Sequence, residues 1–232
     1  MMTNDITTKV IGVAGFARSG KDTFVKVATN ILLNNGYSVT KLAFADDLKN
    51  DIDDWLKDKY GISAWTNNLE EKNLIRPFLV AHGCGKRTQT QGKYWVDKIN
   101  RRIELSIQSP IKNHVFFVSD VRFPNEAKWV HESWNGWLVH LKKYILSDLH
   151  AFDGSSYFGT KLYDFAPNEE EAKNDPLVEG QADFKLELEN VIEKEKRNGN
   201  IITVDSLVDS SYLIDEITKC LHHCPFLTLA KP

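Results

Sequence analysis

The sequence predicts an α/β protein with a mostly parallel β-sheet flanked by helices. Short apolar runs alternate along the chain with segments whose apolar residues recur at helical spacing. This order is typical of parallel strands joined by crossover helices. The first apolar run, residues 10–14, leads directly into a glycine-containing loop and a helical segment. Such a strand–loop–helix junction is a common anion-binding site.

The expected elements follow from these two patterns. Apolar runs that are expected to form buried strands lie at residues 10–14, 38–44, 114–120, 136–141 and 200–205. Amphipathic patterns predict helices at residues 20–33, 46–59, 69–80, 94–107 and 211–221, with a further helix starting at Pro124. Residues 82–92 are expected to form a loop, and residues 182–196 fit either a strand or a helix.

Residues 149–178 differ in composition from the rest of the chain. They are rich in Gly, Asp, Asn and Glu, and they carry the aromatic residues Phe152, Tyr157, Phe158, Tyr163 and Phe165. A long irregular stretch inside a compact domain is often a mobile functional lid. Scattered aromatic residues are unusual in disordered segments, so a lid is favoured over a disordered insertion.

The composition indicates one compact domain. The 232 residues are 42% hydrophobic and 26% charged, and the net charge of -3 argues against a generic nucleic-acid coat. Three cysteines are too few for a disulfide framework and favour a reducing compartment. The motif CLHHC at residues 220–224 has no second ligand pair for zinc and is interpreted as a helix end. Since neither a signal pattern nor an apolar run of ~18 residues is present, we expect a cytoplasmic protein without a membrane partner.

A phosphate-binding loop is predicted after the first strand. Gly15, four intervening residues, Gly20 and Lys21 match the Walker-A spacing up to its last position. The glycines would let backbone N–H groups close around phosphate oxygens, and the following helix N-terminus adds partial positive charge. Lys21 could span the β- and γ-phosphates.

Asp22 stands where this loop normally carries Ser or Thr. A carboxylate beside polyphosphate repels it unless a cation lies between them, so Asp22 could hold Mg²⁺ directly or through water, with Thr23 supplying a hydroxyl. Two alternatives remain open. Asp22 could accept a hydrogen bond from Arg18 or from a substrate, or it could simply be a carboxylate favoured by the helix dipole.

A second group of charged residues follows the run at residues 114–120. Asp120 lies at the carboxyl end of that strand, where parallel sheets bind ligands. Arg122 could neutralise a phosphate bidentately, and Glu126 falls in the first turn of the next helix. The structural alternatives are a helix cap for Asp120 and a surface ion pair for Arg122.

Five segments of the chain occur in a characteristic order: GFARSGKDT, FADDLK, RPFLVAHGCG, KYWVDK and VSDVRFPNEA. In this order they resemble the deoxynucleoside monophosphate kinases of tailed bacteriophages and their bacterial relatives, over roughly residues 10–141. That family has the P-loop nucleoside-monophosphate-kinase fold and moves a phosphoryl group from ATP to a dNMP, and its loop also ends in Lys followed by Asp. Phosphomevalonate kinase is similar in SGKD and VSD-x-R.

The resemblance implies a donor site and an acceptor site. ATP would be bound through Gly15, Arg18, Ser19, Gly20, Lys21, Asp22 and Thr23, with Mg²⁺ at Asp22 and Thr23. The acceptor would be bound through Arg76, Gly83, Trp95, Asp120, Arg122 and Glu126. The catalytic set would be Lys21, Arg76, Asp120 and Arg122.

The chain departs from the family at two positions of the motif R-x-x-x-Q-x-x-G-T. Arg76 and Gly83 match its arginine and glycine, but Val80 replaces the glutamine and Cys84 the threonine. Two polar contacts to the substrate base would therefore be missing. Trp95 matches the tryptophan of the family's YWV segment, where it could form a wall for a nucleobase.

We therefore expect a single P-loop kinase domain over residues 1–232. Its core would span about 9–48 and 112–144, a substrate-binding helical segment about 49–111, a lid about 145–182 and C-terminal core elements about 183–232. The expected reaction converts ATP and a dNMP to ADP and a dNDP, in the host cytoplasm if the protein is phage-encoded. The expected partners are small molecules, with a homodimer as one option. The alternatives are a kinase of another phosphorylated metabolite and a P-loop nucleotide-binding module without transfer.

Overall fold

The computed structural model describes residues 8–107, 113–147, 160–197, 200–207 and 210–230. Its strands are β1 (Thr8–Ala14), β2 (Ser38–Leu42), β3 (His114–Val121), β4 (Trp137–Ser147), β5 (Thr160–Tyr163), β6 (Phe184–Arg197) and β7 (Asn200–Leu207). Its helices are α1 (Lys21–Asn34), α2 (Phe44–Tyr60), α3 (Leu69–Thr90), α4 (Lys93–Ser106), α5 (Pro124–Trp134), α6 (Glu169–Glu179) and α7 (Ser210–His222).

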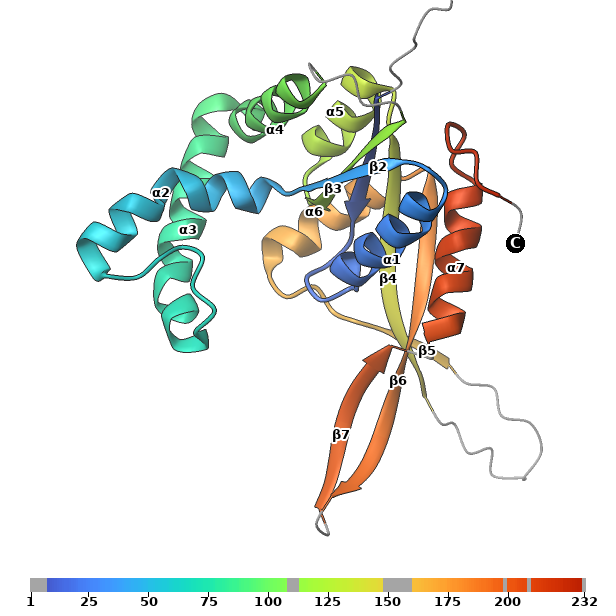
Figure 1. The fold of residues 1–232 in the computed structure, drawn as a ribbon. Coiled ribbons are helices and arrows are strands. Elements are labelled where there is room, and N and C mark those ends of the chain that lie inside the picture. Colours follow the sequence, from blue (N-terminus) through green and yellow to red (C-terminus); the bar gives the residue numbers. More distant parts are fainter. Residues whose placement is uncertain (1–7, 108–112, 148–159, 198–199, 208–209, 231–232) are drawn as a thin grey trace, which may run out of the picture.

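The fold confirms the predicted α/β class, with a mostly parallel central sheet flanked by helices. The strands follow the order β2-β3-β1-β4-β6-β7, and β5 pairs with β4 off this path. The pairs β2–β3, β3–β1, β1–β4 and β4–β6 are parallel, whereas β7 and β5 join antiparallel. The β6–β7 hairpin projects beyond the body of the sheet (Figure 1). The central position of β1 places the loop that follows it at the middle of one sheet edge.

Side-chain alternation along β1 separates two hydrophobic layers. Ile11 and Val13 face the layer that contains α1 and α7. Val10 and Ala14 face the opposite layer. Because all four residues are fully buried, the strand has no solvent-facing side, as expected for a central parallel strand.

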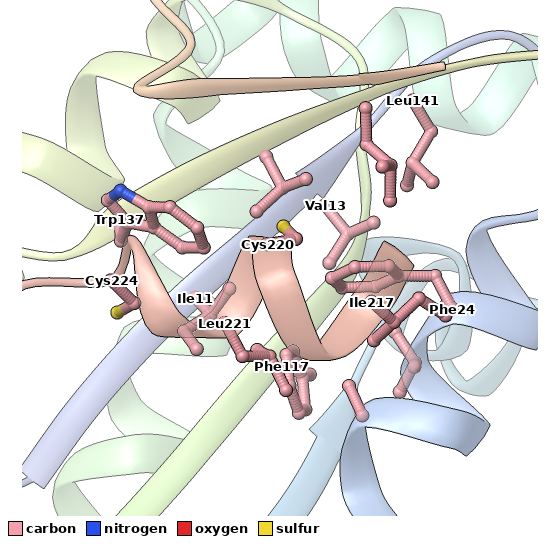
Figure 2. Close-up of a cluster of buried hydrophobic side chains, with 14 of the residues drawn as sticks. Ile11, Val13, Phe24, Phe117, Trp137, Leu141, Ile217, Cys220, Leu221 and Cys224 are labelled. Carbon is pink, nitrogen blue, oxygen red and sulfur yellow. The ribbon is translucent and has the colours of Figure 1, made fainter. Parts of the chain in front are cut away.

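Helices α1 and α7 cover the first face of the sheet. Figure 2 shows Phe24 from α1 and Ile217 and Cys220 from α7 gathered over strand residues such as Phe117. Phe24 and Phe117 pack edge to face with ring centroids 6.3 Å apart. Cys224 belongs to the same core, and burial raises the pKa of its thiol to about 12. The CLHHC segment is therefore the apolar end of a core helix and the turn that follows.

Helices α4, α5 and α6 cover the opposite face. Their buried apolar residues are Trp95, Ile99 and Ile103 from α4, Ala127, Trp129 and Val130 from α5, and Val178 from α6. Helices α2 and α3 extend from this side as a helical arm, residues 44–90 (Figure 1). The arm has a small core of its own, consisting of Ile52, Leu56, Ala64 and Ile75.

The helix predicted at residues 69–80 continues to Thr90, so the loop expected at residues 82–92 was wrong over most of its length. Gly83 is buried close to Leu48, and its carbonyl accepts the indole N–H of Trp95. These tertiary contacts outweigh the weak helix propensity of glycine. The helix ends where the chain adopts positive φ at residues 91 and 92.

The segment expected to be irregular at residues 149–178 contains regular structure. A strand, β5, pairs with an extended β4, and α6 begins after Asn168, whose side chain accepts the amide of Glu171. An N-cap of this kind is a local helix signal. The irregular expectation was wrong for these residues, while Phe152, Tyr157 and Phe158 lie outside the described residues. Of the two alternatives for residues 182–196, the strand is confirmed as β6.

A substitution at Gly85 tests the extended α3. An added Cβ at Gly85 meets nothing within 4 Å, so Gly85→Ala should raise the free energy of unfolding by up to about 1 kcal/mol, the usual helix-interior gain. Gly92→Ala is the contrasting variant, because Gly92 lies at φ +82° with Asn125 Nδ2 2.6 Å from the added Cβ; it should destabilise. Urea denaturation measures both, and a destabilising Gly85→Ala would contradict a helix at this position.

Candidate phosphate and acceptor site

The loop between β1 and α1 has the shape of an anion cradle. Gly15 lies at φ +129°, and a Cβ there would stand 2.3 Å from the carbonyl oxygen of Leu141. Gly20, at φ +92°, directly precedes Lys21, the first residue of α1. Glycine is therefore required at the first position by close backbone contact and favoured at the second by conformation. The first backbone N–H groups of α1, which have no acceptor within the helix, lie next to the loop.

Lys21 is buried inside this loop. Its ammonium group donates to the carbonyl oxygens of Gly15 at 2.7 Å and Phe16 at 2.5 Å. Burial, followed by the nearby charge of Arg122, lowers the pKa of Lys21 from 10.5 to about 8. Glu171, Asp120 and Asp22 oppose this lowering but do not cancel it, so the loop holds a desolvated cation that is a good partner for a phosphate.

The expected magnesium residues lie beside the loop but differ in exposure. The Asp22 side chain is 86% exposed and pairs with Lys41 of β2 at 2.5 Å, a partner that the sequence analysis did not consider. Asp22 and Thr23 both line the cavity next to the loop. Hard oxygen donors suit Mg²⁺, which commonly takes one or two protein ligands plus phosphate and water. In the described part of the chain no three His, Cys, Asp or Glu residues cluster as a metal site.

Asp120 joins the sheet to the helical arm. Its two carboxylate oxygens accept the amides of Phe44 at 2.8 Å and Ala45 at 2.9 Å, at the start of α2. Burial raises the pKa of Asp120, and the two backbone hydrogen bonds oppose that rise. These contacts are those of the helix cap that the sequence analysis gave as the structural alternative for Asp120, and the capped helix is α2.

Arg122 contacts a carboxylate that the sequence analysis did not single out. Its Nη1 lies 2.5 Å from Oε1 of Glu171 in α6. The other oxygen of Glu171 accepts the amide of Ala17, in the phosphate loop, at 2.9 Å. Glu171 thus links α6 both to the loop and to the arginine that follows β3.

Glu126 is a buried carboxylate with structural partners. It accepts the amides of Arg122 at 2.8 Å and Phe123 at 3.1 Å, and it pairs with Arg87 at 3.2 Å. Burial raises the pKa of Glu126 to about 7. The Arg87 guanidinium lies 3.4 Å from the centroid of the Phe123 ring. Its Nε atom is buried without a hydrogen-bond partner among the described residues.

Two cavities meet where β3 ends. One, of about 790 Å³, is bounded by the phosphate loop, the start of α1 and β2, and Lys21 lines it. The other, of about 850 Å³, lies against the helical arm and the first turn of α6. Ala17, Ala45, Asp120 and Arg122 line both cavities. A molecule in each cavity would therefore meet its neighbour beside these residues.

The predicted residues divide between the two cavities. Those of the predicted donor set that line the loop-side cavity are Arg18, Gly20, Lys21, Asp22 and Thr23, while Gly15 and Ser19 are buried within the loop. All of the predicted acceptor residues line the arm-side cavity: Arg76, Gly83, Trp95, Asp120, Arg122 and Glu126.

Two of the predicted acceptor residues, Arg76 and Trp95, differ in their exposure to the cavity. Arg76 is an exposed cation at the cavity wall. Trp95 is only 2% exposed, and its indole N–H donates to the Gly83 carbonyl at 3.2 Å. Trp95 therefore acts mainly as a core residue that fixes α3, with little ring surface available as a wall for a base.

Glu171 and Arg87 are the site residues that sequence reasoning did not assign. Arg87 was placed in an expected loop, and its only local signal is a basic residue near the end of what proves to be a helix. Glu171 lies in an acidic run, EEE, whose N-cap Asn168 predicts a helix start. Neither pattern reveals a partner, because Glu171 is 49 residues from Arg122 and Arg87 is 39 residues from Glu126.

Comparison with known proteins shows only distant likeness. No known family's sequence profile matches this chain, and no curated protein matches it. Among solved structures, shikimate kinase from Acinetobacter baumannii in complex with shikimate is similar at 13% identity and a TM-score of 0.40, covering 94% of this chain and 93% of that one. TT1252 from Thermus thermophilus is similar at 15% identity and a TM-score of 0.41, covering 93% and 96%. The fold assignment rests on this chain's own strand order and pairing.

None of the helices in the described residues combines the length and the apolar character needed to cross a bilayer.

Burial of the charged Lys21 ammonium should lower the free energy of unfolding, although the same charge would favour phosphate binding. Depression of the pKa to about 8 means that folding costs up to ~3 kcal/mol while the lysine stays charged, since one pKa unit is ~1.36 kcal/mol. Lys21→Met keeps the length and removes the charge, so at pH 7 we expect the free energy of unfolding to rise by ~1–3 kcal/mol.

The sign of the pH dependence is fixed by the same shift. The destabilisation of the wild type by the buried charge is fully present below pH 8 and is relieved as the pH rises toward 10.5. The difference in the free energy of unfolding between Lys21→Met and the wild type should therefore shrink over that range. Urea titrations at several pH values measure it. A variant less stable than the wild type at pH 7 would show that the carbonyl hydrogen bonds outweigh desolvation.

Proposed function

We propose that this protein is a kinase that transfers the γ-phosphoryl group of ATP to a deoxynucleoside 5′-monophosphate, giving ADP and a dNDP. The observation that carries the proposal is the junction of the two cavities at Ala17, Ala45, Asp120 and Arg122. Phosphoryl transfer needs two phosphates in line with their charge neutralised, and little covalent help from the protein. A pair of adjoining cavities with Arg122 at their boundary and Lys21 in the loop-side cavity supports that chemistry.

The loop-side cavity suits the phosphates of the donor. Backbone amides at the start of α1 and the buried ammonium of Lys21 would hold the triphosphate. Mg²⁺, held by Asp22 and Thr23, would supply charge neutralisation between the phosphates. Bound phosphate would also raise the pKa of Lys21 above its depressed value and keep the ammonium charged at neutral pH.

The arm-side cavity suits a phosphorylated acceptor. Arg76, Arg87 and Arg122 place guanidinium groups around it, and guanidinium binds phosphate bidentately. The cavity is also lined by apolar residues, Leu48 from α2 and Leu79, Val80 and Cys84 from α3. We assign the phosphate of the acceptor to the arginines and its base to these apolar residues.

In the proposed reaction, the bond that breaks and the bond that forms both belong to the substrates. The bond between the γ-phosphorus and its bridging oxygen breaks, and a phosphate oxygen of the acceptor forms the new bond. Arg122, at the junction, would stabilise the charge on the transferring group. Asp120 would act as a positioning residue, because its carboxylate fixes the amides that begin α2.

One observation favours a second candidate, a kinase of another phosphorylated metabolite. Val80 and Cys84 stand at positions where a nucleotide base would otherwise meet a glutamine and a threonine, and both line the arm-side cavity. An acceptor with an apolar body, such as phosphomevalonate, would lose nothing there, whereas a base leaves its polar edge without those partners.

An acceptor panel decides between these candidates. ADP release with MgATP should be seen with at least one dNMP, with the dNDP product identified by chromatography, and should fall to background in Lys21→Met. Transfer to phosphomevalonate alone would select the metabolite kinase. MgATP binding without transfer to any acceptor would indicate a nucleotide-binding module and would contradict the proposal.

Arg76→Ala tests the acceptor site. Loss of a charged hydrogen bond worth about 1.5–3 kcal/mol should raise the KM for the acceptor by roughly tenfold or more, while the KM for ATP changes less than about twofold because Arg76 lies outside the loop-side cavity. Arg101→Ala is the matched control, since Arg101 is an exposed arginine on α4 that lines neither cavity. Equal effects on both KM values would contradict the assignment.

A further inference from the structure

Glu171 lies where a phosphate would be expected at the junction of the cavities. Its carboxylate accepts the Ala17 amide at 2.9 Å and the Arg122 guanidinium at 2.5 Å, and the residue is only 8% exposed. A loop amide and an arginine are typical phosphate ligands. Ala17 and Arg122 line both cavities, and Glu171 itself lines the arm-side one, so the carboxylate binds two groups of the junction.

Helix α6 contacts the sheet through acidic side chains on one of its sides. Asp175 pairs with His140 of β4 at 2.9 Å, and Glu179 pairs with Lys142 at 2.7 Å. Together with Glu171, these acidic residues recur every four positions and so share one side of the helix. Val178 is the one fully apolar residue of α6 that is buried in the main core among the described residues. The contacts of Glu171 with Arg122 and of Glu179 with Lys142 are ion pairs, and another anion can compete for such cations.

The first turn of α6 lacks one backbone hydrogen bond to the rest of the helix, although the Asn174 side chain donates to the Glu170 carbonyl at 2.8 Å. Pro176 lies inside α6 and has no N–H to donate to the carbonyl of Ala172 four residues earlier. Val178 and the Asp175–His140 pair hold the C-terminal half, whereas Glu171 holds the first turn. The contacts of the first turn with the junction are therefore distinct from those that hold the C-terminal half.

We propose that Glu171 is a displaceable anion, which competes with the phosphate at the junction for the Ala17 amide and the Arg122 guanidinium. A carboxylate and a phosphate repel each other and cannot both occupy this position. Arrival of phosphate would release the first turn of α6, and its departure would allow the turn to return. This inference rests on the proposed function only in requiring that a nucleotide phosphate reaches the junction.

Calorimetry with the magnesium complex of AMPPNP, a non-hydrolysable ATP analogue, tests the competition. Glu171→Gln keeps the shape of the side chain and removes its charge, so it should tighten binding roughly tenfold, within the usual range of coupling between sites. Glu170→Gln removes the same charge from the same turn at an exposed position that lines the arm-side cavity but not the loop-side cavity proposed for ATP, so it should change binding of the analogue less than about twofold. Unchanged or weakened binding in Glu171→Gln would overturn the proposal, since it would make Glu171 a support for Arg122.

Hydrogen exchange of residues 169–173 gives a readout that does not need a ligand. In the ligand-free protein, these amides should exchange faster in Glu171→Gln than in the wild type or in Glu170→Gln. The same amides of the wild type should exchange faster when the analogue is added. If no variant binds the analogue, the proposed function fails, but exchange in the ligand-free proteins still tests the inference. Equal exchange rates in the wild type, Glu171→Gln and Glu170→Gln would overturn it. Faster exchange in Glu171→Gln alone would support it.

Discussion

The hydrogen bonds of Asp120 are the constraint on which the arrangement of the two cavities depends. A carboxylate at the end of β3 holds the first amides of α2, and α2 carries the helical arm. Hydrogen bonds to a charged group contribute about 1.5–3 kcal/mol each, enough to fix the direction in which the arm leaves the sheet. The arm in turn places Arg76 and Arg87 in the lining of the arm-side cavity. Without that cap, the loop would still resemble an anion cradle, but the arm-side cavity would lose its position.

Charge at the junction is balanced by protein groups. Arg122 pairs with Glu171, Arg87 pairs with Glu126, and the Lys21 ammonium lies against backbone carbonyls. Phosphates would have to replace some of these partners, so binding is an exchange of one anion for another. The exchange differs between the two arginine pairs. Glu126 also caps α5 through two amides and is nearly fully buried, whereas Glu171 sits on a helix turn with a missing backbone hydrogen bond. The second pair is the easier one to open.

The sequence predicted those features that are encoded locally. The strand–loop–helix around Gly15 and Lys21, the alternation of strands and helices, and the position of Asp120 at a strand end all follow from spacing within a short segment. The continuation of α3 through Gly83 was missed because it depends on Trp95 and Leu48, which reach that glycine from other helices. The strand and helix within residues 149–178 were missed because their polar composition dominates the signal. The partners of Arg122 and Arg87 depend on long-range contacts that no local pattern contains.

The central claim, that a donor and an acceptor meet between the two cavities, is tested most directly by a bisubstrate analogue. Adenosine joined to thymidine through five phosphates would place its two nucleosides in the loop-side and arm-side cavities. Calorimetry should show one analogue bound per chain, much more tightly than ADP or dTMP alone, with Arg76→Ala and Lys21→Met each weakening binding. Binding no tighter than ADP, and unaffected by Arg76→Ala, would show that only the phosphate loop is engaged and would contradict the two-cavity account.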